Sequence, residues 1–345
     1  MSVASLAARI VMRLSPADRR DWAHAMACEI AAVEGAGTRR FALGCIAAAA
    51  MLRIDWIGRR GMKMVERPRA ATVACGVVAS VLGLVHLVAA GASPFMPVTN
   101  AVALVLALTL LAFTWRTTIP AGVVVVATGA VLLATAFLGS SAEGATRWVR
   151  IAGIAVQPSL ILLPLAIVLH VTGRNRATTA GLALAALALA VQPDRAMAGA
   201  LLVALLAGGR RSGAIAPAAA AIGLAVAMIR PDAVPAVPSV DGVLYAALHM
   251  NVVAAVAVFA GTAILLAPLA IARAPATAAF GACWLGVVAA AALGDYPTPL
   301  VGFGGSAILG YLLAAARLPA GRASRARTID TATAAGEETR LFRLA

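Results

Sequence analysis

The chain has few charged and few aromatic residues, and these two shortages define its class. Of its 345 residues, 12% are Asp, Glu, Lys or Arg and 5% are aromatic, whereas 62% are hydrophobic. The mean hydropathy is +0.94. No soluble domain of this length buries that much apolar surface, so the composition excludes a soluble enzyme and indicates a protein solvated by lipid. Since Ala, Val, Leu and Gly dominate, we expect close-packed helices with small residues at their contacts.

Metal-binding and cofactor-binding motifs are also missing. The four cysteines have no metal-type spacing, and Cys75 and Cys283 fall within apolar runs, so we expect inert thiols and no disulfide framework. His86, His170 and His249 have no second ligand at metal spacing, which favours hydrogen-bonded histidines. There is no P-loop, dinucleotide fingerprint, nucleophile elbow or zinc-protease motif. The sequence therefore predicts no metal site and no cofactor.

Acidic residues are half as frequent as basic ones, and the formal net charge is +14. Twelve of the 28 Lys and Arg precede residue 70, and six lie from Arg317 onward. The basic residues thus flank the apolar core, where anionic lipid headgroups are the nearest partners. This distribution predicts membrane lipids as partners and argues against nucleic acid.

Residues 1–66 form a separate N-terminal region, predicted to be a small helical unit on the cytoplasmic side or in the interface. Ser15 and Pro16 are typical of a helix start, and an amphipathic helix over Pro16–Val33 would gather Trp22, Met26, Ile30 and Val33 on one face. The apolar segment Phe41–Leu52 is shorter than the about 20 residues that a span needs. It is expected to lie in the interface or to pack on the first helix.

Hydropathy predicts an all-α, polytopic integral membrane protein. Ten spans are expected in a domain over residues 67–317, before a disordered cytoplasmic tail over 318–345: roughly 71–91, 96–115, 119–139, 156–172, 177–191, 196–209, 213–229, 243–271, 276–293 and 301–316. The basic N-terminal region and Arg-rich alternate loops place both termini in the cytoplasm. The five acids between Arg67 and Arg317 then all lie outside, on a functional surface: Glu143, Asp194, Asp232, Asp241 and Asp295.

The stretch between the third and fourth predicted spans is the most specific motif. Arg147-Trp148-Val149 is followed, after a short bridge containing glycine, by Gln157-Pro158-Ser159. This arrangement resembles the R-R-W-I and Q-P-S-E signature of the SEDS family, the FtsW/RodA/SpoVE polymerases of bacterial cell-wall glycan. The resemblance implies a multi-pass protein of the bacterial inner (cytoplasmic) membrane, in cell-wall synthesis, cell division or cell shape.

Three further segments resemble the family in the same order along the chain. Gln192-Pro193-Asp194 matches its Q-P-D, Asp241 stands where the family has H-T-D-F, and Pro297–Ser306 is similar to P-F-I-S-Y-G-G-S. The chain departs from the family elsewhere. Thr146 replaces the first Arg of the signature, Leu160 and Leu163 replace an acid and a base, and the long external loop before Asp241 is nearly absent.

The resemblance implies that Asp241 is a general base, which takes a proton from an acceptor-sugar hydroxyl while polyprenyl diphosphate leaves a lipid-linked donor. External arginines would face the diphosphate. The residues alone also allow Asp241 to cap the helix that opens at Gly242, arginines to bind lipid phosphates, Trp148 to anchor at the interface, and Asp194 to pair or to cap a helix. The candidate substrate-binding residues are Arg147, Trp148, Arg150, Gln157, Ser159, Asp194, Arg195, Gly304, Gly305 and Ser306, with Arg230 as a further external cation.

Two functions follow from these motifs. One is an enzyme that polymerises a lipid-linked disaccharide precursor, with a class B penicillin-binding protein as a candidate partner. The other is a non-catalytic protein on the same scaffold, which binds the precursor or a partner protein and which the missing acid–base pair favours. A transporter has little support, because the predicted spans carry almost no charge for coupling ions.

Overall fold

A computed structural model describes residues 3–33, 37–65, 67–114, 119–232 and 234–320. The chain divides into two compact units, one over Met1–Glu66 and the other beginning at Arg67. The expected tail over 318–345 lies almost entirely outside the described residues.

The first unit consists of three helices with a core of their own. These are α1 (Val3–Leu14), α2 (Arg20–Ala32) after a 3-10 turn at Ala17–Arg19, and α3 (Gly37–Val65). Ile30 is fully buried, and Trp22 and Met26 pack in the same cluster as Ala42, Cys45 and Ala49 of α3. The apolar face of α2 therefore packs on Phe41–Leu52, which was one of the two predicted docking surfaces.

The unit has the predicted bounds, but the helices predicted within it were wrong in two ways. Helix α1 was not expected, and Phe41–Leu52 belongs to a single helix of 29 residues. Ser15 does not begin a helix: its hydroxyl donates to the carbonyl of Val11 at 2.8 Å and so closes α1. The Ser-Pro pair therefore marks a helix boundary, as predicted, but Ser15 ends α1 and does not cap the helix that follows.

Because the first unit has its own core, we expect deletion of residues 1–66 to leave the second unit folded. Burial of the three side chains on the α2 face stabilises the first unit by about 1.5–3 kcal/mol each. These side chains belong to the core of the first unit, so the deletion removes none of the core of the second. The measurement is size-exclusion chromatography of the truncated chain in detergent. An aggregated product under conditions in which the full chain is monodisperse would contradict this expectation.

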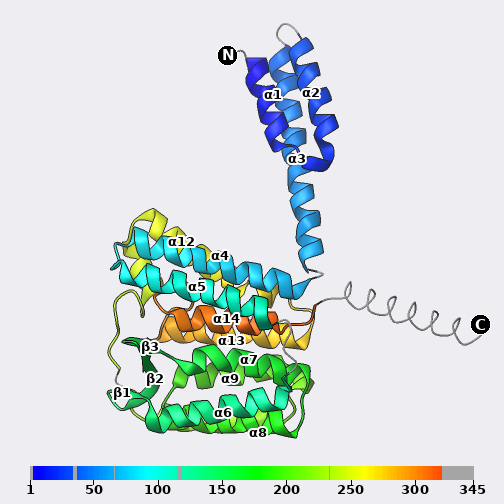
Figure 1. Ribbon diagram of the computed structural model, residues 1–345. Helices are drawn as coiled ribbons and strands as arrows, with labels where there is room; N and C mark the ends of the chain where they lie inside the picture. Colours follow the sequence, from blue (N-terminus) through cyan, green and yellow to red (C-terminus); the bar gives the residue numbers. More distant parts are fainter. Residues whose placement is uncertain (1–2, 34–36, 66, 115–118, 233, 321–345) are drawn as a thin grey trace, which may run out of the picture. The chain divides into compact units, whose positions relative to one another are not determined.

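The second unit is a bundle of apolar helices, and the protein is a multi-pass membrane protein (Figure 1). Five helices within the described ranges are long and apolar enough to cross a membrane: α4 (Pro68–Ala89), α5 (Phe95–Thr114), α6 (Ala121–Leu138), α12 (Val252–Ala270) and α13 (Pro275–Leu293). Five are apolar but shorter: α7 (Pro158–Thr172), α8 (Arg176–Val191), α9 (Arg195–Ala207), α10 (Ile215–Ile229) and α14 (Gly305–Ala316). Each of these ten helices overlaps one predicted span.

The eighth predicted span, 243–271, is interrupted. Residues Val243–Ala246 form the short helix α11, a 3-10 turn follows at Ala247–His249, and α12 begins only at Val252. Asn251 causes the new start, because its side chain accepts a hydrogen bond from the backbone N–H of Ala254 at 2.9 Å. The tenth predicted span is also shorter than expected, since α14 begins at Gly305.

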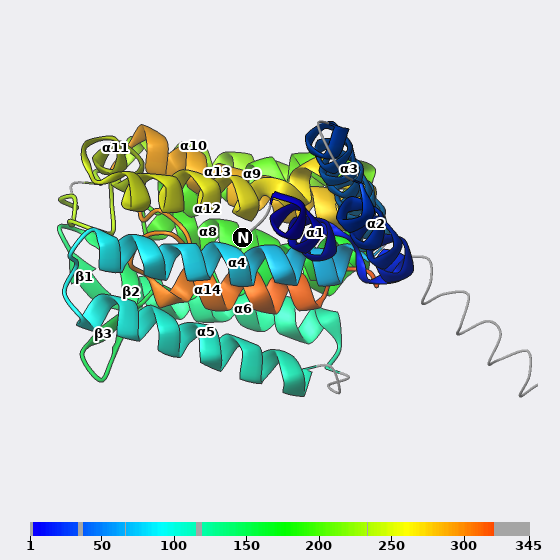
Figure 2. The same ribbon diagram turned by 90° about the horizontal axis from the view of Figure 1, so that it is seen from above.

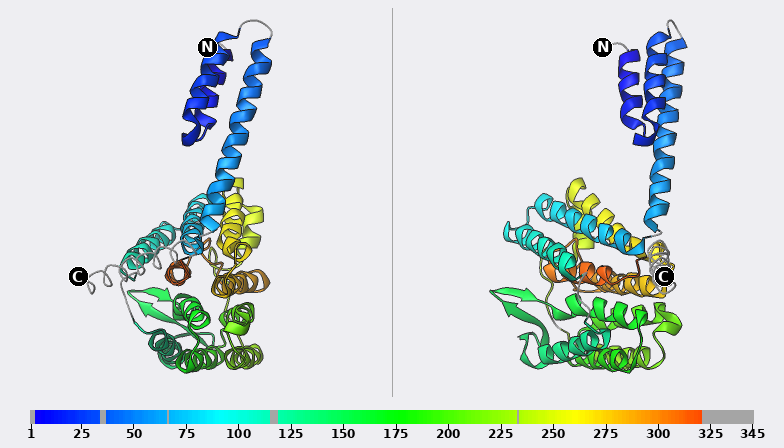
Figure 3. Two further views of the ribbon diagram at one scale, coloured as in Figure 1. Left: turned by 90° about the vertical axis from the view of Figure 1, so that its right-hand side faces the viewer. Right: turned by 45° about the vertical axis from the view of Figure 1, so that its right-hand side comes forward.

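Helix α14 lies in the middle of the bundle, where it packs against α4, α5 and α7. Figure 2 shows it beside α4 and α5, and the left view of Figure 3 shows it end-on. Gly310 permits the contact with α7, because a Cβ there would collide with the carbonyl oxygen of Leu160. Tyr311 packs edge-on against Phe280 of α13, with ring centroids 4.9 Å apart, and donates to the carbonyl of Leu265 at 3.0 Å.

A three-stranded antiparallel sheet joins α6 to α7 at one end of the bundle (Figure 1). Its strands are β1 (Ser140–Ala142), β2 (Ala145–Ile151) and β3 (Ile154–Val156). Both connecting turns, Glu143-Gly144 and Ala152-Gly153, have positive φ at each residue, as two-residue hairpins require. The Arg147-Trp148 motif thus lies on a strand, which the expectation of an all-helical chain did not include.

Candidate functional site

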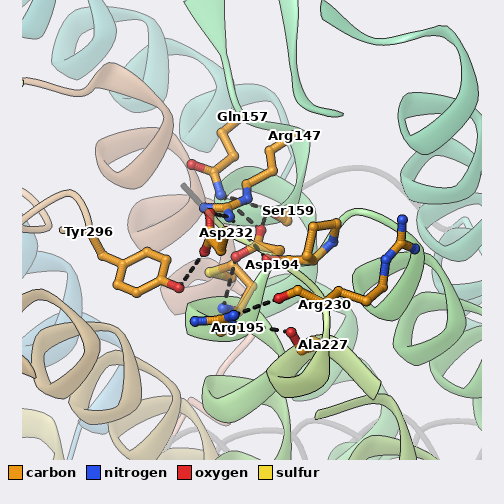
Figure 4. Close-up of polar contacts among 11 residues, drawn as sticks. Arg147, Gln157, Ser159, Asp194, Arg195, Ala227, Arg230, Asp232 and Tyr296 are labelled. Carbon is orange, nitrogen blue, oxygen red and sulfur yellow. Dashed lines mark hydrogen bonds and ion pairs between the residues drawn. The ribbon is translucent and has the colours of Figure 1, made fainter. Parts of the chain in front are cut away.

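The four segments that resemble the SEDS family are joined by hydrogen bonds at the end of the bundle that carries the sheet. Gln157, just before α7, donates its backbone N–H to Ser306 Oγ of α14 at 3.1 Å. Arg147 of β2 donates to the carbonyl of Pro193 at 2.9 Å. The segment 237–241 is joined to 297–303 by Thr298 N–H to the Val240 carbonyl at 3.0 Å. Segments up to 149 residues apart therefore form one structure (Figure 4 shows its centre).

A buried polar network surrounds Asp194 (Figure 4). Oδ2 of this carboxylate accepts from Gln157 Nε2 and Ser159 Oγ, both at 3.0 Å. Oδ1 accepts from the backbone N–H of Met197 at 3.2 Å, so Asp194 also caps α9. The predicted cap is confirmed, whereas Asp194 forms no salt bridge with Arg147 or Arg195 in the described part of the chain. A buried carboxylate with three donors fixes the ends of α7 and α9.

Asp194→Asn should therefore destabilise the protein. The amide nitrogen would face donors where a carboxylate now accepts, and each lost hydrogen bond to a charged group costs about 1.5–3 kcal/mol. The measurement is the apparent Tm in detergent, with Asp295→Asn as the matched control because Asp295 is exposed. Equal values of Tm for the two variants would contradict the structural role of the network.

Arg147 and Asp232 form a buried ion pair, with side chains only 4% and 6% exposed. Tyr296 donates its hydroxyl to Asp232 Oδ2 at 2.7 Å. The guanidinium carbon of Arg147 lies 5.7 Å from the Trp148 ring and 5.6 Å from the Tyr296 ring, as in cation–π contacts. Burial, followed by the hydrogen bond to Asp232, raises the pKa of Tyr296, so its hydroxyl stays protonated and continues to donate.

Asp241 is half-buried in the segment before α11. Oδ2 accepts from the backbone N–H of Val237 at 2.8 Å, and no side-chain bond caps α11. The alternative in which Asp241 caps this helix is therefore wrong. Burial raises the pKa of Asp241, and Asp295 adds to this, whereas the Val237 N–H and Arg147 act in the opposite direction. Arg147 is not free to pair with Asp241, because it forms its ion pair with Asp232.

The other predicted cations do not gather around Asp241. Arg150 is exposed at the sheet. Arg195 donates to the carbonyls of Ala227 at 3.2 Å and Arg230 at 2.5 Å, and Arg230 donates to that of Val191 at 2.8 Å. These two arginines tie the ends of α8, α9 and α10 together (Figure 4). A single cluster of four external arginines is therefore not formed.

The segment Pro297–Ser306, called the glycine-containing segment below, is held by Asn100 of α5. The amide of Asn100 donates to the Gly302 carbonyl at 3.0 Å and accepts from the Gly304 N–H at 3.1 Å. Gly305 lies so close to α5 that a Cβ there would be 2.7 Å from the Cβ of Ala103. Sequence reasoning missed Asn100 and Tyr296 and did not assign Asp232 a partner. A lone Asn in an otherwise apolar predicted span is the signal that could have identified Asn100, which the structure shows fully buried.

The positions of the family's acid and base are apolar and buried. Leu160 is 6% exposed and Leu163 is fully buried in the bundle core. In the described ranges, no group of three His, Cys, Asp or Glu could hold a metal ion. The polar groups that the described segments bring together here are carboxylates, arginines, amides, hydroxyls and backbone groups.

No protein-family model matches the chain. No curated protein matches it either. Among solved structures, the chain is similar to the rod shape determining protein RodA of Thermus thermophilus, at 21% identity and a TM-score of 0.48, over 71% of this chain and 93% of that one. A variant of the same protein with one Asp replaced by Ala matches equally well, over 94% of its length.

A chain from a peptidoglycan synthase complex, in which polymerization and crosslinking are coordinated, is similar at 19% identity and a TM-score of 0.48. It is covered over 96% of its length, and this chain over 71%. The segments of this chain that resemble the SEDS family lie together at one end of its bundle of apolar helices.

Proposed function

We propose that this protein acts in bacterial cell-wall synthesis and polymerises a lipid-linked disaccharide precursor by glycosyl transfer. The observation that supports this most is the assembly of four separate SEDS-like segments into one hydrogen-bonded site. Asp241, Arg147 and the glycine-containing segment belong to that site, although they are far apart in the sequence. We also propose a location in the cytoplasmic membrane with both termini inside, on the basis of the charge distribution.

In this mechanism Asp241 is the general base. Its carboxylate takes the proton from the acceptor hydroxyl, whose oxygen forms the new bond to the anomeric carbon while the bond to the polyprenyl diphosphate breaks. The raised pKa makes the carboxylate a stronger proton acceptor than an ordinary Asp. The Val237 N–H holds it in place, and Arg147 is the cation best placed to compensate the departing diphosphate.

A second function is supported by one specific observation. Leu160 and Leu163 fill the positions of the family's acid and base and are packed into the core, so no protonatable group can act there. A scaffold that binds the lipid-linked precursor or a class B penicillin-binding protein needs no such pair.

The deciding experiment is a polymerisation assay in proteoliposomes with a polyprenyl-diphosphate disaccharide, with and without class B penicillin-binding proteins of the same cell. Glycan longer than the disaccharide on a gel supports the enzyme. Binding of the precursor without product under every condition would replace the enzyme with the scaffold.

The proposed topology gives a separate expectation. Arg174→Cys and Arg210→Cys should be labelled by a membrane-impermeant thiol reagent only after permeabilisation, because both positions lie in the basic loops that we place inside. Glu143→Cys is the control, since its exposed turn is placed outside. Labelling of Arg210→Cys in intact cells would reverse the proposed topology and place Asp241 on the cytoplasmic side.

A further inference from the structure

The ion pair between Arg147 and Asp232 lies within the candidate site, next to the bond from Arg147 to the Pro193 carbonyl. Both side chains are more than nine-tenths buried, and the pair closes the contact between β2 and the segment that follows α10. Tyr296 contributes both the hydroxyl that binds Asp232 and a ring beside the guanidinium (Figure 4). Asp232 is thus the anion that this site now holds.

Arg147 has binding capacity that the protein does not use. Its Nη2 donates to Pro193 and pairs with Asp232, but its buried Nε has no hydrogen-bond partner in the described structure. A guanidinium offers five N–H donors in a planar fork, which suits two phosphate oxygens better than one carboxylate oxygen. The unused donor is the second observation that indicates a ligand with several anionic oxygens.

Asp232 is also connected to the proposed base. The residues 234–241 follow it and carry Asp241, and this segment is otherwise held to 297–303 by backbone bonds from Thr298 and Phe303 to the Val240 and Ser239 carbonyls. The ion pair of Asp232 with Arg147 lies just before this segment in the chain. A change at Arg147 would therefore act directly on the segment that bears Asp241.

We propose that Asp232 is an internal competitor for Arg147, and that the diphosphate of a lipid-linked ligand displaces it and thereby releases the segment 234–241. This inference rests on the proposed function for the identity of the ligand. The exchange leaves Arg147 compensated throughout, because a diphosphate replaces the carboxylate. The cost of removing both charges from water can exceed their mutual attraction, so a buried ion pair need not stabilise the fold. Displacement of Asp232 by a ligand gives this pair a role other than stability.

Binding of polyprenyl diphosphate and of inorganic pyrophosphate to the full chain in zwitterionic nanodiscs tests this directly. Asp232→Asn should raise the affinity for both probes about tenfold, within the usual range of coupling between two sites. Tyr296→Phe should raise it about fivefold, because one hydrogen bond to Asp232 is lost. Arg147→Gln should remove the gain in the Arg147→Gln, Asp232→Asn double variant. Asp295→Asn is the matched control, since it removes the same charge from an exposed position.

A second measurement follows the segment itself. Thr298 is 2% exposed and is joined to Val240, so Thr298→Cys in a chain whose native cysteines are replaced by Ala should react slowly with a thiol reagent. Pyrophosphate, Asp232→Asn or Tyr296→Phe should each speed the reaction several-fold.

Equal affinities of wild type and Asp232→Asn would overturn the proposal, as would an equal gain in Asp295→Asn. If Asp232→Asn cannot be purified, Tyr296→Phe decides by the same comparison. Neither measurement needs polymerisation. If Asp232→Asn binds the probes more tightly but no glycan is formed, the enzyme is rejected and the role of Asp232 as a competitor stands. If glycan is formed but Asp232→Asn binds no more tightly than wild type, the enzyme stands and the competitor role is rejected.

Discussion

Asp241→Asn should lose nearly all polymerisation activity while the protein still folds and still binds its lipid-linked ligand. A general base contributes about 10²–10⁴-fold, and the amide cannot accept the proton. The Asn oxygen can still accept the Val237 N–H, so the local backbone should persist. The measurement is the initial rate of glycan formation, with Glu143→Gln as a control on an exposed turn of the same end.

The pH profile gives the same prediction an independent test. The base works when deprotonated, so the rate should fall as pH decreases through its pKa. Because burial raises this pKa, the fall should lie at higher pH than for an ordinary Asp. Asp295 raises the pKa further, so Asp295→Asn should shift the fall to lower pH. A variant Asp241→Asn that keeps wild-type rate would show that another group takes the proton, and an unchanged profile in Asp295→Asn would argue against Asp241 as the titrating base.

Gly310→Ala should prevent stable folding of the second unit. The new Cβ would collide with the backbone carbonyl of Leu160, which no side-chain rotation can relieve, so α14 must move away from α7. Overpacking usually costs about 1–3 kcal/mol, and a clash with backbone belongs at or beyond the upper end. Separation of these helices would also break the bond from Gln157 to Ser306.

Gly199→Ala is the matched control for this substitution. Gly199 lies in α9 with open space where its Cβ would be, and Ala is the better helix former by about 1 kcal/mol. We expect Gly199→Ala to keep or raise the apparent Tm and Gly310→Ala to aggregate on size-exclusion chromatography. Similar behaviour of the two variants would mean that close approach at α14 does not limit stability.

The apolar helices were predictable because lipid requires long apolar runs, and each of the ten longer helices in the described part of the second unit overlaps a predicted span. Their interruptions were not. Asn251 restarts a helix inside an apolar run, and whether a lone Asn caps a helix or faces a neighbour depends on contacts made by other segments. The sheet was missed for another reason. The first residue of each turn, Glu143 or Ala152, has positive φ but is not the Asn, Asp or Gly typical of a two-residue hairpin, so the sequence carried only half of the usual turn signal.

For the site, local motifs gave the segments but not their partners. Gln157, Ser159 and Asp194 were identified individually, yet the network that joins them depends on the approach of α7 to α9. Arg147 was expected to face the diphosphate of a substrate, and in the structure it forms an ion pair with Asp232. Competition between two acids for one cation is decided by distance, which sequence order does not specify.

The central position of α14 has a consequence for biosynthesis. Ser306 accepts the bond from Gln157, Asn100 binds Gly302 and Gly304, and Arg69 binds the carbonyl of Leu318. Segments made early therefore wait for α14 and the residues beside it to leave the ribosome. Such distant contacts form late, after loop-closure entropy has been overcome. Nascent chains stalled before residue 305 would thus be inserted in the membrane without a finished site.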